Sequence, residues 1–358
     1  MPSQTHLDSE VLIVGAGLSG LAAARALAQA GYRGHVIDKG SSVGGRLATR
    51  RIAGGLADHG AQFFTARSEV WKAQVAQWQS EGLVTIWSNG FSDGKRPVES
   101  FDGHPRFVTR EGMNRLAKRL AVDVGELASF HLDTRIVSVE PLGNGWLAVA
   151  ESGTRWTAPA LLLTAPVPQS LALLGDAAGR MSSADRDALT RIVYAPCVAG
   201  LFAVGGGTRL PHPGALQRPD AEITWIADNQ RKGISPGARI ITLHAGTRLS
   251  QSLWDQSEAT GLQVLSAELS HWLEPGTAIH EAHLKRWRYA QPIVTHPERC
   301  LLASGLSPLV FAGDAFGESR VEGAYLSGLA AAAALIEALS QGHGLSFHPG
   351  NSQPRNEN

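Results

Sequence analysis

A glycine pattern near the start of the chain constrains the fold more than any other feature. A short apolar run, Val11–Val14, precedes the pattern and predicts a buried parallel strand. An Ala/Leu-rich segment, residues 19–30, follows and predicts a helix, and a second short strand at 35–37 ends on Asp38. The glycines have G-x-G-x-x-G spacing: Gly15, Gly17 and Gly20. This order predicts a βαβ unit and therefore an α/β fold with a parallel sheet.

Each glycine of this pattern has a physical role. Gly15 allows a tight turn, Gly17 lets the backbone approach a pyrophosphate, and Gly20 lets the helix pack closely on the strand. Free N–H groups at the helix N-terminus would face the phosphates. Asp38 stands where a carboxylate can accept a hydrogen bond from a ribose 2′-OH, and its charge disfavours a 2′-phosphate. The pattern predicts an adenine dinucleotide site, for NAD or FAD; a strand–turn–helix without a ligand is the alternative.

Composition narrows the classes of protein that the chain can be. The 358 residues have a formal net charge of +0, so nothing favours binding to nucleic acid or to an anionic membrane. No apolar run approaches the roughly 20 residues that span a bilayer, and the polar N-terminus lacks signal-peptide features. The two cysteines, Cys197 and Cys300, form no C-x-x-C motif. We therefore expect a cytoplasmic protein of about two domains, with reduced thiols and no metal site.

Two further segments suit contact with a dinucleotide. The paired glycines before Arg46 predict a loop, from which the guanidinium could make a bidentate contact with pyrophosphate; a solvated basic turn is the alternative. Residues 56–65 have no helical or strand period and place Gln62 and Phe63 beside a Gly-Ala pair. That composition suits a chain packed against a planar ligand, or an ordinary buried loop. His59, taken alone, is more typical of a structural histidine.

Three motifs together resemble the flavin-containing amine oxidase superfamily: GAGLSG with its downstream acid, GGR, and DHGAQFF. Their order is also similar to that of a small bacterial, renalase-like branch. The resemblance implies a glutathione-reductase-like FAD-binding fold of the Rossmann type. It also implies contacts with FAD at Ser19, Asp38, Lys39, Gly45, Arg46, Gln62 and Phe63. The predicted strand 132–139 adds a backbone contact from Ile136 to the adenine.

The C-terminal third of the chain carries a second set of motifs. A strand at 309–312 ends at Gly313 and Asp314, and an Ala-rich helix begins near Gly323 and Ala324. Asp314 could accept a hydrogen bond from a ribityl hydroxyl. The helix N-terminus could direct its positive end at the flavin edge that carries charge after reduction. Two motifs so far apart along the chain favour one extended cofactor, FAD, over NAD.

The remaining segments predict a covering domain. Strands at 198–204, 222–227 and 239–245, with a helix at 253–272, predict an α+β domain. Its antiparallel sheet would cover the flavin ring. We therefore predict an FAD-binding domain in three pieces, residues 8–66, 104–168 and 285–342, interleaved with a substrate domain, residues 67–103 and 169–284. The first piece of the substrate domain includes a helix at 69–79, whose Trp71 and Trp78 belong to a core, and a short strand at 97–101. The polar tail, 343–358, is expected to be disordered.

Four side chains are candidates for catalysis: Gln62, Trp225, His244 and Trp287. The segments around Trp225 and His244, and the W-R-Y-A-x-P run that starts at Trp287, resemble parts of the renalase-like proteins. His244 could orient a substrate carboxamide or transfer a proton, or be a hydrogen-bonded sheet histidine; Trp225 could line the site or belong to the core. The family's covalent members attach FAD through a cysteine near 291–294. This chain has none there, so FAD is expected to bind noncovalently.

The resemblance also implies an activity. Renalase-like proteins are FAD-dependent oxidases that accept hydride from 2- and 6-dihydro isomers of NAD(P), and O₂ is reduced to H₂O₂. The expected partners are therefore a small-molecule hydride donor and O₂, with no nucleic acid and no membrane; the oligomeric state is not indicated. Three alternatives remain open: an amine oxidase or desaturase-type dehydrogenase, a non-catalytic flavin-binding redox sensor, and an NAD-dependent dehydrogenase without flavin.

Overall fold

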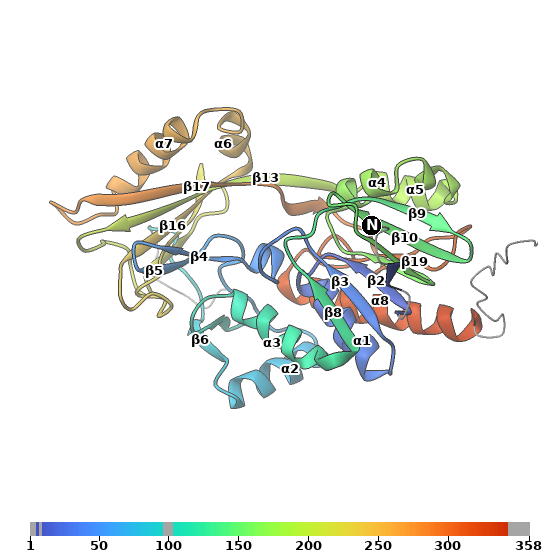
Figure 1. Ribbon diagram of the computed structural model, residues 1–358. Helices are drawn as coiled ribbons and strands as arrows, with labels where there is room; N and C mark the ends of the chain where they lie inside the picture. The colour runs from blue at the N-terminus through green and yellow to red at the C-terminus, as the bar shows by residue number, and fades with distance from the viewer. Residues whose placement is uncertain (1–4, 7–8, 96–102, 343–358) are drawn as a thin grey trace, which may run out of the picture.

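Long strands join two parts of the molecule, each built on a sheet. The computed structural model describes residues 5–6, 9–95 and 103–342. Figure 1 shows β13 (Val193–Val204) and β17 (Ile279–Val294) running from one part to the other. The two strands pair antiparallel along most of their length, with register shifts near Tyr194 and Cys197. They therefore tie the two parts together by main-chain hydrogen bonds.

A six-stranded sheet forms the core of the first part. Its strands are β2 (Val11–Val14), β3 (Gly34–Ile37), β8 (Ala128–His131), β12 (Ala160–Leu163), β18 (Leu301–Leu302) and β19 (Leu309–Phe311). Their order is β18-β19-β12-β2-β3-β8, and all neighbours are parallel except β18 with β19. All residues of β2 and β12 are buried, as in central strands covered on both faces. The predicted α/β fold with a parallel sheet is confirmed.

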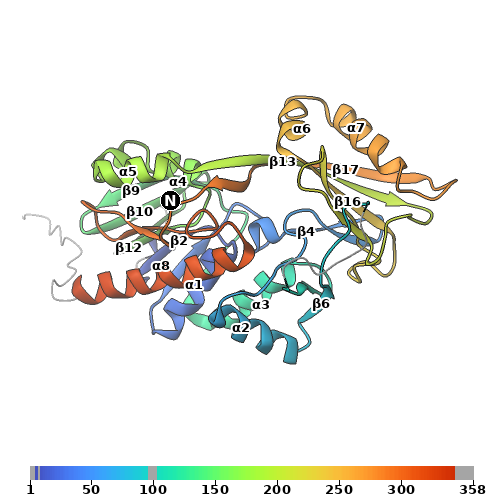
Figure 2. The same cartoon turned by 180° about the vertical axis from the view of Figure 1, so that it is seen from behind.

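Helices cover one face of this sheet: α1 (Leu18–Gln29), α3 (Asn114–Val124) and α8 (Val321–Gly342). Figure 2 shows α8 lying beside α1. The two helices meet at Gly328, where an added Cβ would lie 2.2 Å from the carbonyl oxygen of Ser19. Only a glycine fits at this distance, because any side chain would overlap the neighbouring backbone.

A small sheet and two helices cover the other face. Strands β1 (Thr5–His6), β9 (Ile136–Leu142), β10 (Gly145–Ala150) and β11 (Arg155–Ala158) form the sheet, and α4 (Val167–Leu174), the 3₁₀ helix η3 (Gly175–Arg180) and α5 (Ser183–Thr190) follow it. Trp146 and Trp156 are buried between this layer and the parallel sheet. β12 ends at Leu163, and α4 begins at Val167 with Pro168 in its first turn, because proline suits the first turn of a helix but not a strand interior.

The second part is a five-stranded antiparallel sheet in the order β14-β15-β16-β13-β17. The shorter strands are β14 (Ala215–Gln217), β15 (Ile223–Asp228) and β16 (Ile240–Ala245). Helices α6 (Thr247–Ser252) and α7 (Glu258–Ser270) pack on one face, where Leu265 and Leu269 are fully buried. The expected helix at 253–272 begins five residues later, because Ser257 caps α7 by accepting a hydrogen bond from the Thr260 N–H.

The remaining elements are smaller. They are the hairpins β4 (Thr49–Ile52) with β5 (Gly55–Asp58) and β6 (Val84–Ser88) with β7 (Arg106–Thr109), the helix α2 (Glu69–Ser80), and the 3₁₀ turns η1 (Gly45–Leu47) and η2 (Gly125–Leu127). Trp71 and Trp78 of α2 are fully buried, which confirms that they belong to the core.

Two local predictions were wrong. The Gly-Gly-Arg segment is a 3₁₀ turn, η1, and not a loop; Gly44 and Gly45 enter it with φ of 118° and 52°, which glycine adopts without strain. The strand predicted from residue 132 begins only at Ile136. Asp133 has a φ of 50° and turns the chain first.

One helix differs from the compositional expectation. Val321–Gln341 has the length and hydropathy of a membrane-spanning helix, although no such run was expected. Half of its most apolar window is buried, and it packs on α1, β12 and β19. Its many alanines allow that close packing, so the position of the helix in the core accounts for its composition.

Some predictions fall outside what the structure describes. The expected strand at 97–101 and the expected disordered tail at 343–358 lie among residues that are not described. The division into an FAD-binding and a substrate domain stays a prediction. Residues 69–80, expected in the covering domain, pack as α2 in the same apolar cluster as α1, α3 and α8.

Candidate functional site

A large cavity lies between the parallel sheet and the antiparallel sheet. Its volume is about 1610 Å³, above the usual 300–1,000 Å³ of a small-molecule site. The ends of β2, β3, β12 and β19 form one end, and β15, β16 and β17 form the other. All predicted site residues line it except Gly20 and Gly323. The cavity therefore has room for a dinucleotide and a second molecule.

The glycine turn after β2 is built for a close ligand. An added Cβ on Gly20 would lie 2.0 Å from the carbonyl oxygen of Gly15, so Gly20 allows helix–strand packing as predicted. An added Cβ on Gly17 would meet nothing within 4 Å, and Gly17 lines the cavity. No side chain caps α1 at Gly17, and the buried hydroxyl of Ser19 has no hydrogen-bond partner. This N-terminus thus offers donors to a phosphate.

Asp38 stands at the end of β3, on the wall of the same end of the cavity. Its carboxylate accepts hydrogen bonds from the N–H groups of Ala16 and Gly40, both at 2.7 Å. These bonds hold the carboxylate beside the glycine turn and leave it lone pairs for a further donor. Lys39 and Ile136 line the wall next to it. The structure thus brings the acid of the motif to the position that a ribose hydroxyl would need.

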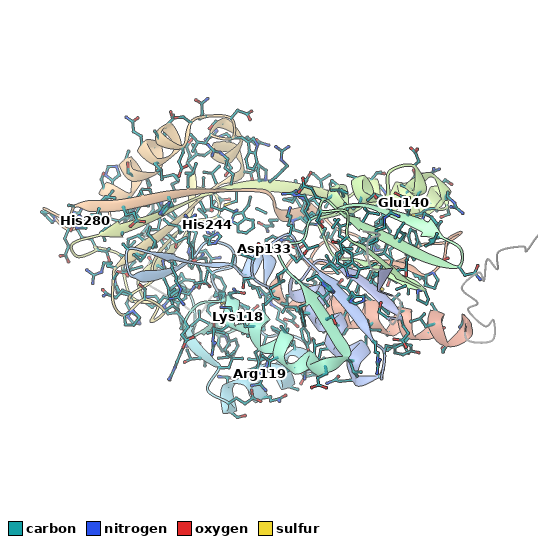
Figure 3. The ribbon with its side chains drawn as sticks, in the orientation of Figure 1. Lys118, Arg119, Asp133, Glu140, His244 and His280 are labelled. Atoms are coloured by element: carbon teal, nitrogen blue, oxygen red, sulfur yellow. The ribbon has the colours of Figure 1, made fainter. Side chains whose placement is uncertain are left out.

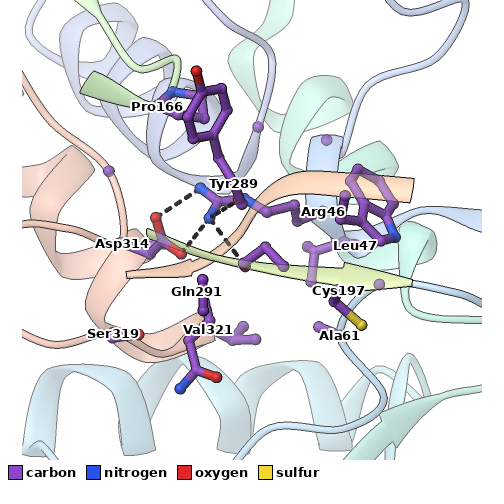
Figure 4. A pocket seen from close by; sticks show the side chains of 18 of the residues that line it. Arg46, Leu47, Ala61, Pro166, Cys197, Tyr289, Gln291, Asp314, Ser319 and Val321 are labelled. Carbon is purple, nitrogen blue, oxygen red and sulfur yellow. Dashed lines mark hydrogen bonds and ion pairs between the residues drawn. The ribbon is translucent and has the colours of Figure 1, made fainter. Parts of the chain in front are cut away.

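Arg46 and Asp314 form an ion pair on the wall of the cavity. The guanidinium donates two hydrogen bonds of 2.6 Å to the two carboxylate oxygens, and further bonds to the carbonyls of Tyr289 and Ala290 (Figure 4). The bidentate face of Arg46, predicted to hold a pyrophosphate, therefore points at Asp314. The pair links η1, β17 and the end of β19, so the two distant halves of the motif set do meet.

The start of α8 reaches the cavity through Ala324, and not through the predicted Gly323. Ala324 lines the cavity, and Gly313 does so at the end of β19. Gly323 does not line it: an added Cβ there would lie 1.8 Å from the carbonyl oxygen of Glu318. Gly323 therefore lets the helix start against the preceding loop, and its contribution to a ligand is indirect.

Gln62 lies on the wall at the other end, where the two sheets meet. Its amide nitrogen donates to the carbonyls of Asp58, at 2.7 Å, and Gly60, at 3.1 Å. The same nitrogen lies 3.4 Å from Nε2 of His244. The amide oxygen is buried and has no partner. Because both N–H groups serve carbonyls, this oxygen is an acceptor without a donor, on a side chain that lines the cavity.

Aromatic side chains form the rest of that wall. The rings of Phe63 and Trp225 are 5.5 Å apart, and the indole N–H of Trp225 is buried without a partner. Trp287 stacks on His59, with centroids 5.3 Å apart and planes at 20°, and donates to the carbonyl of His59 at 2.8 Å. Sequence reasoning treated His59 as structural, yet it lines the cavity. No periodic signal could have shown this, since His59 lies in an irregular segment.

Both histidines of the site are neutral at pH 7. Burial, and then the charge of Lys285, lower the pKa of His59 to about 4. Burial, followed by the influence of His59 and Lys232, lowers the pKa of His244 to about 4. Figure 3 shows His244 in the interior between the two parts, whereas His280 lies at an outer end. His244 can thus donate or accept a hydrogen bond at neutral pH, but it is not an imidazolium acid.

Two further features of the site lay beyond sequence reasoning. Cys197 of β13 lines the cavity (Figure 4), and burial raises the pKa of its thiol to about 12. Lys232 forms a fully buried ion pair with Asp58, 2.6 Å from Nζ to Oδ2, behind the wall that carries Gln62. In the described part of the chain, no three His, Cys, Asp or Glu side chains gather as a metal site would need.

Comparison with known proteins identifies the family. Residues 13–78 match an NAD(P)-binding Rossmann-like domain, and residues 88–336 match the flavin containing amine oxidoreductases. Mouse renalase is 26% identical over 342 residues, which are 90% of this chain and 97% of that protein.

Solved structures have the same fold at low identity. Cyclohexylamine oxidase from Brevibacterium oxydans has a TM-score of 0.70 at 15% identity, over 93% of this chain and 100% of the other. Putrescine oxidase bound to putrescine has a TM-score of 0.61 at 17% identity, again over 93% and 100%. The family match covers more than half of the chain, and the motifs that carry it line one cavity. The chain belongs to the flavin-containing amine oxidoreductase family and is a flavin-dependent oxidoreductase.

Proposed function

We propose that the cavity holds one FAD noncovalently, and that the protein oxidises dihydronicotinamide isomers of NAD(P), with O₂ as the electron acceptor. The observation that carries the cofactor assignment is the meeting of two distant motifs. Gly15 and Asp314 follow strands that flank β12 in one parallel sheet, and both line the same cavity. Parallel strands end at the same sheet edge, which is where such folds bind nucleotides. An extended FAD would contact both; NAD would need only the first.

The residues present suit this cofactor along its length. The uncapped N-terminus of α1, the open face of Gly17 and the unpartnered hydroxyl of Ser19 suit the ADP half. The unpartnered amide oxygen of Gln62 and the ring of Phe63 suit the flavin end. A bound FAD would supply hydride acceptance and electron transfer to O₂, and the overall reaction of donor, O₂ and one proton would give NAD(P)⁺ and H₂O₂.

The charges around the cavity favour a dihydronicotinamide over an amine. Asp314 forms an ion pair with Arg46. Glu222 lies at the surface and forms an ion pair with Arg248. The carboxylate of Glu322 accepts the N–H groups of Arg67 and Ser68. The remaining acids of the lining are Asp38, which holds two backbone N–H groups, and Asp220, which is exposed. Every buried carboxylate of the lining thus already has hydrogen-bond or ion-pair partners, and none stands ready as the unpartnered counter-ion of an ammonium. Burying an ammonium ion without a counter-ion costs free energy, whereas the dihydronicotinamide ring is neutral and avoids this cost.

The chain's own residues would position the donor and exclude water. The rings of Phe63, Trp225 and Trp287 form an apolar wall. The free indole N–H of Trp225 and the free oxygen of Gln62 are a donor and an acceptor, the two groups that a carboxamide requires. A dihydronicotinamide already carries its hydride, so positioning provides the rate and no strong base is needed. The likeness to renalase, at 26% identity, supports this donor class.

Anaerobic stopped-flow mixing tests the proposal. We expect 2- or 6-dihydro-NAD(P) to bleach the visible absorbance of the bound flavin rapidly, and air to restore it with formation of H₂O₂. A panel of primary and secondary amines should leave the flavin oxidised. Bleaching by an amine, with none by the dihydronicotinamides, would overturn the proposed donor and leave the flavin assignment intact.

A further inference from the structure

A buried ion pair lies behind the flavin end of the cavity. The side chains of Asp58 and Lys232 are both fully buried, and neither residue lines the cavity. Burying two charges costs more than exposing them unless each has further partners. Here Oδ1 of Asp58 also accepts from the Thr49 hydroxyl, at 2.5 Å, and from the Met113 N–H, at 2.9 Å. The carboxylate thus has two donors besides the ammonium, and the ammonium has the carboxylate as its hydrogen-bond acceptor.

The partners of the pair come from different parts of the molecule. Met113 stands at the start of α3, in the apolar cluster of the parallel sheet. Thr49 belongs to β4, whose hairpin with β5 packs on the antiparallel sheet. Lys232 follows β15 in the antiparallel sheet, and its ammonium lies 5.3 Å from the ring of Trp87. Trp87 in turn packs edge-on against Trp225 on the cavity wall, at 5.9 Å. The pair thus connects both sides of the site.

The backbone of Asp58 controls the orientation of Gln62. Its carbonyl accepts from the Gln62 amide, at 2.7 Å, and from the Thr242 hydroxyl of β16, at 2.9 Å. The carbonyl of Gly60 takes the second amide hydrogen. A reversed amide would set its oxygen against two carbonyl oxygens, so the two carbonyls fix the amide in the orientation that leaves its oxygen without a partner.

We infer that the Asp58–Lys232 pair is a positioning unit of the oxidoreductase site. It fixes the segment 58–62 against the antiparallel sheet, so that the amide oxygen of Gln62 faces the flavin end of the cavity. The inference rests on the proposed placement of the flavin ring beside Gln62. Neither Asp58 nor Lys232 touches a ligand; they act through Gln62.

The test replaces both charges at once, so that no single charge is left buried. In FAD-loaded D58N/K232M we expect a changed visible flavin spectrum and a loss of about tenfold or more in the rate of flavin reduction at saturating dihydronicotinamide. The matched control is D228N/R239M. Asp228, at the end of β15, is also fully buried and pairs at 3.2 Å with Arg239, which stands just before β16; neither lines the cavity. The control should keep the spectrum, with a rate within about twofold of wild type.

A second background separates positioning from a general structural role. If the pair acts through Gln62, Q62L alone should lose the rate, and adding D58N/K232M to Q62L should cause little further loss. Additive losses, or a wild-type spectrum and rate in D58N/K232M, would overturn the inference. If D58N/K232M does not fold, T242V provides the test. It keeps the side-chain shape, removes one donor to the Asp58 carbonyl, and removes the hydroxyl that accepts from the Asn229 amide. It should alter the spectrum in the same direction, and unchanged behaviour would refute the inference.

Failure of the proposed donor would be recognised separately. A wild-type protein whose flavin is not reduced by dihydronicotinamides would refute that substrate. The spectrum and the reduction potential of the bound flavin, measured in the same variants by equilibration with a redox dye, would still decide the role of the pair. A shift in D58N/K232M that is absent from D228N/R239M supports it, and equal values in both contradict it.

Discussion

Two histidines of the cavity wall make folding stability depend on pH. The pKa of His59 and of His244 is about 4 in the folded protein, against 6.5 for an ordinary histidine. Between these values the unfolded chain binds protons that the folded protein does not. Stability is therefore full above about pH 6.5 and is lost as the pH falls towards 4, by about 1.4 kcal/mol for each unit of pKa difference.

Urea unfolding at constant excess FAD should show this loss. The midpoint should fall between pH 7 and pH 4.5, and H244Q should make the pH dependence shallower. The exposed His280 provides the control, because H280Q should leave the slope unchanged. A wild-type midpoint that does not change across this range would contradict the low pKa of both histidines.

Cys197 lines the cavity but should be chemically inert. Burial raises the pKa of its thiol to about 12, and the thiolate is the reactive form. FAD should therefore be released by acid precipitation of the protein, with no flavin left on the polypeptide. A thiol reagent should modify Cys197 slowly in the folded protein and rapidly in urea. If flavin stayed on both the denatured wild type and the denatured C197S variant, the covalent link would lie elsewhere. If the wild type retained flavin and C197S lost it, the link would be to this thiol.

The elements could be predicted more fully than the contacts between them. Val11–Val14 and the Ala-rich segment 19–30 are short-range patterns, and both became the expected elements. The pairing of Asp58 with Lys232 spans 174 residues of chain, and a lysine is ordinarily exposed, so no local pattern indicates it. The same holds for Arg46 with Asp314: each was recognised as a candidate ligand, but their contact depends on how two distant strand ends meet.

The packing of α1 on α8 makes a prediction at the same scale. An alanine at position 328 would place its Cβ 2.2 Å from the Ser19 carbonyl oxygen and 2.9 Å from Cβ of Ala22, so the helices would have to separate. We expect G328A to lower the free energy of unfolding by about 1–3 kcal/mol. In α7, G261A would meet only the movable end of Leu284, at 3.0 Å. It should be neutral, or stabilising by up to about 1 kcal/mol. Equal effects would contradict the close helix contact.

At the scale of the whole molecule, the cavity lies between the two sheets, which are connected by β13, β17 and a few side-chain contacts. A ligand that contacts both ends binds the folded state alone, and so it should stabilise the protein. Excess FAD at about 100 times its Kd is expected to add about 2.7 kcal/mol to the free energy of unfolding. NAD, which would occupy only the end at the glycine turn, should add less.

Gly17 allows this linkage to be tested without damage to the fold. It has an ordinary φ of −73°, and an added Cβ would meet nothing within 4 Å, so G17D should fold with the stability of the FAD-free protein. Its carboxylate would project into the phosphate position at the N-terminus of α1 and repel the pyrophosphate. We therefore expect G17D to lose the thermal stabilisation by FAD and the yellow colour of the purified protein. Stabilisation by FAD equal to that of wild type would show that the dinucleotide does not lie on this turn, and the placement of the flavin ring beside Gln62 would then lose its anchor.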